Sequence, residues 1–272
     1  MSALNPLTPE QLMNYPVLYT NEKHQDASEK YSLIRSIDII EELKMYDWYV
    51  TSVQVSTTKD LSRKDKQVHC VRLSHIEDLL SPKENTIEVI FFNSTDRTKQ
   101  LELSTGVYKF SCANGLCIGK TYKTYKIKHI GNLQQDLSNI IKEIAEYKPK
   151  IEQRIEDFSS LTLSDSEMKT FAKLAIPLRF EPHLEVDPQS ILIPQREADM
   201  KDHSLYTILN ILQEHLTKSN SISGVNKDTG RKFTSGAITS IKKDYDINVG
   251  IWDLAEKLYL IKSPEPSLAL VA

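Results

Sequence analysis

The segment of residues 88–132 constrains the fold most, because it combines strand-like alternation with strong turn signals. Residues 88–92 are mostly β-branched or aromatic and end in a polar turn, which predicts a strand. Alternation on both sides of Gly106 predicts a second strand that is kinked or turned at that glycine. Asn114-Gly115 predicts a hairpin turn, because both residues tolerate positive φ. A third strand is then expected over residues 116–128.

The third predicted strand interleaves lysines with tyrosines. Alternation places Lys120, Tyr122, Lys126 and Lys128 on one face and Lys123, Tyr125 and Ile127 on the other. Residues 97–131 contain seven Lys and Arg against one acid, a net charge of +6, whereas the whole chain carries −3. Such a ribbon offers phosphate contacts beside rings on which bases stack.

We therefore predict a nucleic-acid-binding strand made of these lysines and tyrosines, with Arg72 and Arg97 as further contacts and Tyr122 or Tyr125 as the stacking ring. The alternative is a solvated edge strand, on which lysines prevent pairing with other sheets.

Composition bounds the class of protein. With 272 residues, 40% hydrophobic and 26% charged, the chain is typical of globular proteins that bury a sizeable core. Neither a secretory signal nor an apolar run long enough for a membrane span is evident, and the three cysteines form no disulfide framework. We expect a cytoplasmic protein that does not contact membranes.

The remaining pattern places strands before helices, which favours the α+β class with an antiparallel sheet of about five strands over residues 46–128. Ser36 is expected to cap a helix, and strands are expected over residues 46–56 and 68–73. A long helix follows residue 132 and either kinks or ends near Pro149, and the C-terminal half is helical. The predicted divisions are an N-terminal arm outside the core (1–30), an α+β core domain (31–180) and a helical region packed on the core (181–272).

Two C-terminal segments are ambiguous in sequence. Residues 219–231 are rich in glycine and serine and are expected to be flexible. The apolar pattern after residue 237 predicts two helices, or one helix broken near Tyr245-Asp246.

No motif for a cofactor or a metal is present, so we expect neither. Cys112 and Cys117 straddle the predicted turn and lack the spacing of zinc ligands. Acids such as Asp96, Asp199 and Asp202 are scattered along the sequence, and they could bind magnesium together only if the fold brings them close.

Several other residues have both a structural and a functional interpretation. His69 is expected to be buried and hydrogen-bonded to the turn at Asn93, because it lies on the opposite face from Arg72 in a regular strand. Asn114 and Gly115 are expected to serve through backbone geometry. His129 and Gly131 precede a helix, where they either cap it or assist a bound anion.

A set of motifs spread over nearly the whole chain resembles the prophage- and plasmid-encoded proteins grouped as domain of unknown function 932, including its UPF0380 subset. The motifs are Ile37–Ile40, His69-x-x-Arg72, Asn93-Ser94, Gly106-x-Tyr108-x-Phe110-x-Cys112-x-Asn114-Gly115-Leu116, His129-x-Gly131, Arg196-x-x-Asp199, Gln213-Glu214 and Ile247-Asn248 through Trp252-x-Leu254-Ala255-Glu256. Relatives tend to have histidine, aspartate and glycine where this chain has Thr95-Asp96-Arg97, and tryptophan near Tyr206. If that histidine is catalytic in the family, this chain lacks it.

The resemblance implies a protein of mobile-element DNA metabolism. A strand-rich core followed by a long helix is also similar, by fold analogy, to Rad52-type single-strand annealing proteins. Our first hypothesis is a non-enzymatic protein that binds nucleic acid, with single-stranded DNA favoured, and that could form homo-oligomers. The alternatives are a metal-dependent nuclease or hydrolase, and an interaction module whose partner is a host or phage protein.

Overall fold

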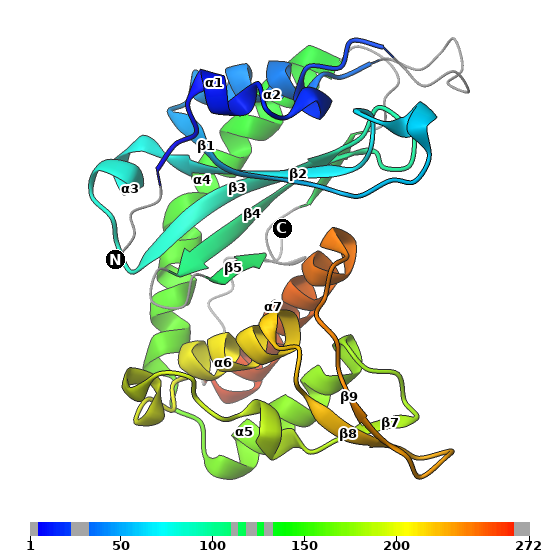
Figure 1. Ribbon diagram of the computed structural model, residues 1–272. Helices are drawn as coiled ribbons and strands as arrows, with labels where there is room; N and C mark the ends of the chain where they lie inside the picture. The colour runs from blue at the N-terminus through cyan, green and yellow to red at the C-terminus, as the bar shows by residue number, and fades with distance from the viewer. Residues whose placement is uncertain (1–4, 23–32, 110–113, 118–123, 128–132, 264–272) are drawn as a thin grey trace. The chain divides into compact units, whose positions relative to one another are not determined.

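The computed structural model describes residues 5–22, 33–109, 114–117, 124–127 and 133–263 (Figure 1). The chain divides into two compact units, which are described separately. Unit 1 contains Met1–Gly115 and Tyr122–Pro149, and unit 2 contains Leu116–Thr121 and Lys150–Ala272. The division at residues 149 and 150 lies within a helix, whereas the sequence placed its second boundary at residue 180.

An antiparallel sheet forms the centre of unit 1, as the sequence predicts for an α+β protein. Its strands are β1 (Trp48–Val55), β2 (His69–His75), β3 (Asn85–Asn93), β4 (Leu101–Lys109), β5 (Asn114–Cys117) and β6 (Tyr125–Ile127). The order is β1-β2-β3-β4-β5, and β6 also pairs with β4. The first four strands follow one another as neighbours in space, because each connection returns the chain to the adjacent position.

The third predicted strand differs from the structure. Residues 116–128 do not form one strand, since they contribute to two short strands, β5 and β6, that both pair with β4. Asn114 and Gly115 begin β5 and are not the predicted turn. Gly106 lies opposite Glu88 in an unbroken register, so β4 carries no kink there, and the irregularity of the sheet is in β1, between Val50 and Ser52.

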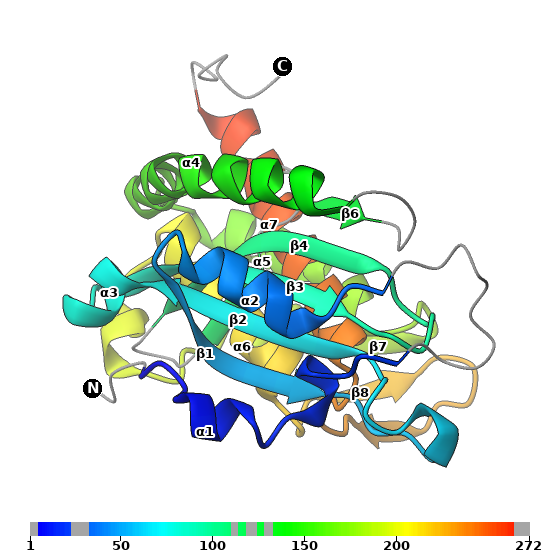
Figure 2. The ribbon, with the colours of Figure 1, turned by 90° about the horizontal axis from the view of Figure 1, so that it is seen from above.

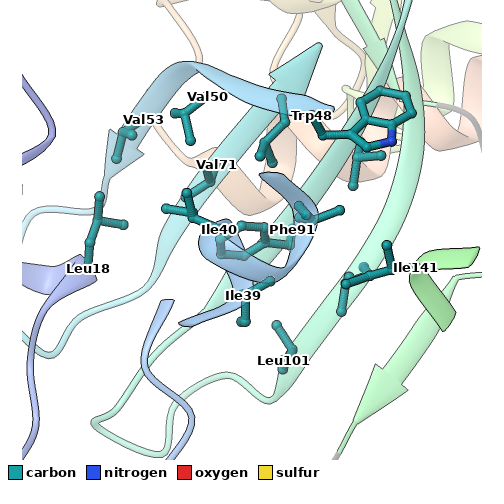
Figure 3. Close-up of a cluster of buried hydrophobic side chains, with 14 of the residues drawn as sticks. Leu18, Ile39, Ile40, Trp48, Val50, Val53, Val71, Phe91, Leu101 and Ile141 are labelled. Atoms are coloured by element: carbon teal, nitrogen blue, oxygen red, sulfur yellow. The ribbon is translucent and has the colours of Figure 1, made fainter. Parts of the chain in front are cut away.

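One face of the sheet is covered by helices α1 (Pro9–Leu12), α2 (Ser36–Lys44) and α4 (Leu133–Ser160) (Figures 1 and 2). The alternating residues of β1 to β4 meet α2 and α4 in a hydrophobic core (Figure 3). Figure 3 shows Ile39 and Ile40 of α2 over Val71 and Phe91 of the strands. Burial of these side chains is the main force that holds the helices on the sheet.

The N-terminal segment contributes to this core, although the sequence predicted an arm outside it. Leu12, Val17 and Leu18 are buried in the hydrophobic cluster. The Leu7 amide also donates a hydrogen bond to the Val50 carbonyl at 2.7 Å. The prolines and polar residues of this segment dominate its composition, whereas a few spaced apolar side chains decide its packing.

Unit 2 contains the helices α5 (Asp165–Ala175), α6 (Leu205–Lys218) and α7 (Ile241–Lys262), with a second small sheet. A capping box starts α5, because the Ser164 hydroxyl accepts from the Glu167 amide and the Glu167 carboxylate accepts from the Ser164 amide. Helix α7 runs unbroken through Tyr245 and Asp246 and packs against α5 and α6. The rings of Phe158 and Trp252 pack against each other inside this unit in a tilted arrangement, with their centroids 5.1 Å apart.

The small sheet of unit 2 is formed by β7 (Leu184–Val186), β8 (Ser223–Asn226) and β9 (Lys232–Thr234), in that order. Four residues of the segment that the sequence predicted to be flexible (219–231) form β8, and residues 227–231 connect β8 to β9. The polar residues of that segment make the hydrogen bonds of a hairpin, which composition alone does not distinguish from a flexible loop.

Two further predictions concern helices of unit 1. Helix α4 continues through Pro149, which resolves the alternatives at that residue in favour of one helix. Ser36 is the first residue of α2, and Arg35 takes the capping position. The Ser36 hydroxyl bonds to His69 and Asn93 and not to the helix.

The short helix α3 (Ile76–Leu80) follows β2. Within the described chain, no helix is long and apolar enough to span a membrane.

Candidate nucleic-acid interface

Two connections meet at one end of the large sheet, between β1 and β2 and between β3 and β4. The amides of Thr95 and Asp96 donate to the Lys66 carbonyl at 3.0 and 3.1 Å. The Asp96 carboxylate also lies 3.5 Å from the Arg63 guanidinium. These bonds hold the two loops together as one surface. We call this surface the basic loop end and define it as residues 59–66, residues 96–102 and Lys126.

The basic loop end carries an excess of cations. It contains seven Lys and Arg against four Asp and Glu, a net charge of +3, so the rest of the chain carries −6. Four of its cations are exposed, namely Lys59, Lys64, Arg97 and Lys126. A local positive surface on an acidic chain attracts polyanions to one place on the molecule.

Two of its four carboxylates are buried. Glu102 lies between Lys99, with which it makes a close ion pair, and Lys126, whose ammonium is 3.9 Å away. Asp96 accepts hydrogen bonds from both the amide and the hydroxyl of Thr98.

The other two acids are Asp60, which is exposed and pairs with Arg63 at 3.2 Å, and Asp65, which is half-buried. The four exposed cations outnumber the exposed acids, so the charge presented to solvent is positive.

Arg97 stands at the tip of the β3–β4 connection with an unusual backbone. Its φ is +69°, in the left-handed region that favours glycine. The sequence resemblance noted a glycine at this position in relatives. Here a long cationic side chain occupies the same turn and is exposed. Asp65 in the neighbouring connection has a φ of +62°, so both loops turn through the same conformation.

Arg72, a predicted contact, is held inside the protein. Its guanidinium Nη1 lies 2.5 Å from Glu88 Oε2, and the side chains are 12% and 1% exposed. Burial raises the pKa of Glu88, and the charge of Arg72 opposes that rise. The Arg72 guanidinium is itself buried at its carboxylate partner and is not presented to a phosphate, so we leave Arg72 out of the interface.

Tyr125 and Lys126 point to opposite sides of β6, as the alternation predicts. Tyr125 packs against the hydrophobic core, beside Glu143 and Tyr147 of α4. Burial and the Glu143 carboxylate raise the pKa of its hydroxyl. The ring therefore does not lie on the side of β6 from which Lys126 extends, and we do not assign it a stacking role.

Several predicted site residues lie outside the described part of the chain, namely Lys120, Tyr122, Lys123, Lys128, Cys112, His129 and Gly131. Their roles stay predictions. Of the predicted nucleic-acid contacts, the structure brings together Arg97 and Lys126 at one end of the sheet.

His69 is buried in a polar network, close to the expected arrangement. Its Nε2 lies 2.6 Å from the Ser36 hydroxyl, and its Nδ1 lies 3.0 Å from the Gln67 carbonyl. Asn93, opposite His69 across the sheet, donates to the Ser36 hydroxyl and to the Ile34 carbonyl at 3.0 Å. Burial lowers the pKa of His69 to about 4, so the ring is neutral near pH 7. The network joins α2 to β2 and β3.

The acids considered for magnesium are each bonded to neighbours within their own unit. In unit 1, Asp96 accepts from the amide and the hydroxyl of Thr98. Asp199 pairs with Arg196 at 2.8 Å, and Asp202 accepts from the Ser204 amide at the start of α6. Among the residues that the structure describes, no three His, Cys, Asp or Glu side chains are grouped to hold a metal ion, and Cys70 is buried.

The contribution of four cations between the first two predicted strands was not predicted from the sequence, namely that of Lys59, Arg63, Lys64 and Lys66. A signal for them exists. In a sheet whose successive strands pair antiparallel, the first and third connections lie at the same end. The cations of residues 59–66 could therefore have been grouped with Arg97 before the structure was known.

Comparison with known proteins identifies the family. The model for the domain of unknown function DUF932 matches residues 23–239, which is most of the chain. The chain belongs to the DUF932 family. The resemblance drawn from the sequence motifs is thereby confirmed.

Two Escherichia coli K12 proteins are similar to this DUF932 protein over nearly its whole length. The UPF0380 proteins YafZ and YfjQ are each 29% identical over 255 residues, covering 93% of this chain and 92% of the relative. No solved structure matches the chain at a significant level. The family name assigns no activity, so an argument about function depends on the geometry of the chain itself.

Proposed function

We propose that this DUF932 protein is a non-enzymatic nucleic-acid-binding protein of prophage or plasmid DNA metabolism, and that the basic loop end contacts the phosphate backbone. One observation carries the proposal. A net charge of +3 is concentrated on two bonded loops and β6, while the rest of the chain carries −6. Phosphate contacts from Lys and Arg supply most of the affinity in sequence-independent binding.

The backbone at Arg97 supports the same conclusion. A non-glycine residue in the left-handed region costs roughly 1–2 kcal/mol, and such strain is concentrated at functional sites. A contribution of the exposed Arg97 guanidinium to nucleic-acid binding would explain why the strained conformation is kept at the loop tip.

The proposal concerns the phosphate backbone, which single strands and duplexes share. The predicted preference for single-stranded DNA depended on stacking by Tyr122 or Tyr125. Tyr125 packs into the core, so no described ring supports that preference, and strand preference is an outcome of the experiment.

The test is binding of a fluorescently labelled DNA duplex, its single strand and the matching RNA over a series of salt concentrations. For the variant Lys64→Gln/Lys126→Gln we expect weaker binding and a log–log salt slope reduced by about 1.8 on the duplex, since each phosphate contact contributes about 0.9. Both side chains are exposed, so the fold is expected to persist.

The matched control is Lys169→Gln/Lys173→Gln, which removes two exposed cations of α5. It should bind with the wild-type slope. If the wild-type protein binds none of the three nucleic acids, or if both variants weaken binding equally, the proposed function is wrong.

A further inference from the structure

The hairpin of β8 and β9 in unit 2 exposes a second group of cations. Lys227, Arg231 and Lys232 are all exposed, and Asp228 is the only acid between them. The tip, residues 227–232, therefore has a net charge of +2. Figure 1 shows the connection between β8 and β9 extending beyond the helices of its unit.

Within the described residues, none of these three cations makes an ion pair. This differs from Arg154, Arg179 and Arg196 of the same unit, whose guanidinium groups are bonded to carboxylates or carbonyls. The buried arginines of unit 2 are thus bonded to other groups, whereas the cations of the hairpin lie in solvent. Unpaired cations need no carboxylate displaced before they meet an anion, which lowers the cost of binding.

The hairpin tip is held in one conformation. The Asn226 side-chain carbonyl accepts from the amides of Asp228 and Thr229 at 2.9 and 3.1 Å. The Asn226 amide donates to the Arg231 carbonyl, and the Gly230 amide donates to the Asn226 carbonyl, each at 2.8 Å. Gly230 has a φ of +67°, which closes the four-residue loop.

The underside of the small sheet anchors the hairpin to its unit. Phe233 of β9 packs against Phe180 with ring centroids 5.9 Å apart. Opposite it, Gly224 leaves no room for a side chain, because a Cβ would lie 2.3 Å from the Glu185 carbonyl oxygen. One side of the sheet is thus packed, and the tip carries its cations on a stiff support.

We infer that the tip of the β8–β9 hairpin is a second contact for the DNA phosphate backbone, separate from the basic loop end. This inference rests on the proposed function, because it assigns the same ligand, the phosphate backbone of DNA, to a second surface.

The experiment measures the salt dependence of DNA binding by the full chain with the triple variant Lys227→Gln/Arg231→Gln/Lys232→Gln. If all three cations contact phosphates, the log–log slope on a duplex falls by about 2.7. The matched control, Lys201→Gln/Lys218→Gln/Lys257→Gln, removes three exposed cations elsewhere in unit 2 and should keep the wild-type slope. Thermal unfolding of both variants checks that the fold is retained.

A gain of affinity provides an independent readout. Asp228→Asn removes the acid of the tip and should tighten binding, whereas Asp165→Asn, at an exposed acid of α5, should not. A triple variant with the wild-type slope, while Lys64→Gln/Lys126→Gln still lowers it, overturns this inference and leaves the proposed function intact. A wild-type protein that binds no DNA overturns both.

Discussion

Arg97→Gly should make the protein more stable and a weaker DNA binder at the same time. The substitution removes the cation from the tip of the β3–β4 connection and leaves a residue that adopts its φ of +69° without strain. An ordinary surface substitution changes stability little. A gain of stability coupled to a loss of binding is therefore a specific result.

The expected size follows from two opposing terms. Relief of the left-handed conformation stabilises the folded state by roughly 1–2 kcal/mol. The extra freedom of glycine in the unfolded chain costs roughly 0.5–1 kcal/mol. The midpoints of these two ranges give a net gain of about 0.75 kcal/mol. Loss of one phosphate contact lowers the salt slope on a duplex by about 0.9.

The assay can follow unit 1 alone. The chain has two tryptophans, Trp48 in unit 1 and Trp252 in unit 2. In a Trp252→Phe background, Trp48 reports urea unfolding of the unit that contains Arg97. DNA binding is measured on the same samples at several salt concentrations.

Two controls separate strain from charge. Arg97→Lys keeps the charge and the strain, so stability and slope should stay at the wild-type values. Asp65→Gly relieves the same conformation in the neighbouring loop but removes an acid, and it should not weaken binding. The reasoning fails if Arg97→Gly lowers stability, or if it stabilises the protein without changing the slope.

Two buried groups give further predictions. The folded pKa of His69, about 4, lies below its ordinary value. The contribution of the neutral ring to the free energy of unfolding is therefore fully present above about pH 6.5 and is lost as the pH falls toward about 4. The loss is up to about 1.4 kcal/mol per pH unit. Urea unfolding over this range should show that decline reduced in His69→Gln, and an equal decline in both proteins would contradict it. Arg72→Met leaves the buried carboxylate of Glu88 without its cation and should lower the free energy of unfolding by about 3–5 kcal/mol at pH 7. Arg72→Met/Glu88→Leu should recover most of that loss in urea unfolding, and equal stability of the two variants would refute the argument.

Much of the fold could be predicted because its signals are local. The β-branched and aromatic run of residues 88–92 depends on a few neighbouring residues and lies in β3, as predicted. Asn114-Gly115 has an equally strong local signal, yet it lies in β5, because pairing with β4 outweighs the preference of these residues for a turn. Ser36 is a comparable case, since His69 and Asn93, distant in sequence, determine where its hydroxyl bonds.

The candidate site was less predictable, because charge along a sequence does not state which cations are paired. Arg72 and Arg97 are both arginines of the predicted interface, and the sequence does not distinguish their environments. The register of β2 and β3 places Glu88 beside Arg72, which is buried, whereas Arg97 stands exposed at the tip of a turn. The tyrosines raise the same question, since alternation separates Tyr125 from Lys126 but does not say which side faces α4.

The pairing of Leu7 with Val50 has a consequence for solubility. β1 is an outermost strand of the large sheet, and its free backbone groups could template the strand of another copy. The Leu7 amide donates a hydrogen bond to this edge strand at Val50. The irregularity between Val50 and Ser52 also interrupts the regular backbone of the edge. Truncation before Thr8 would therefore expose the edge of β1 and favour self-association, although it would delete none of the proposed contacts with DNA.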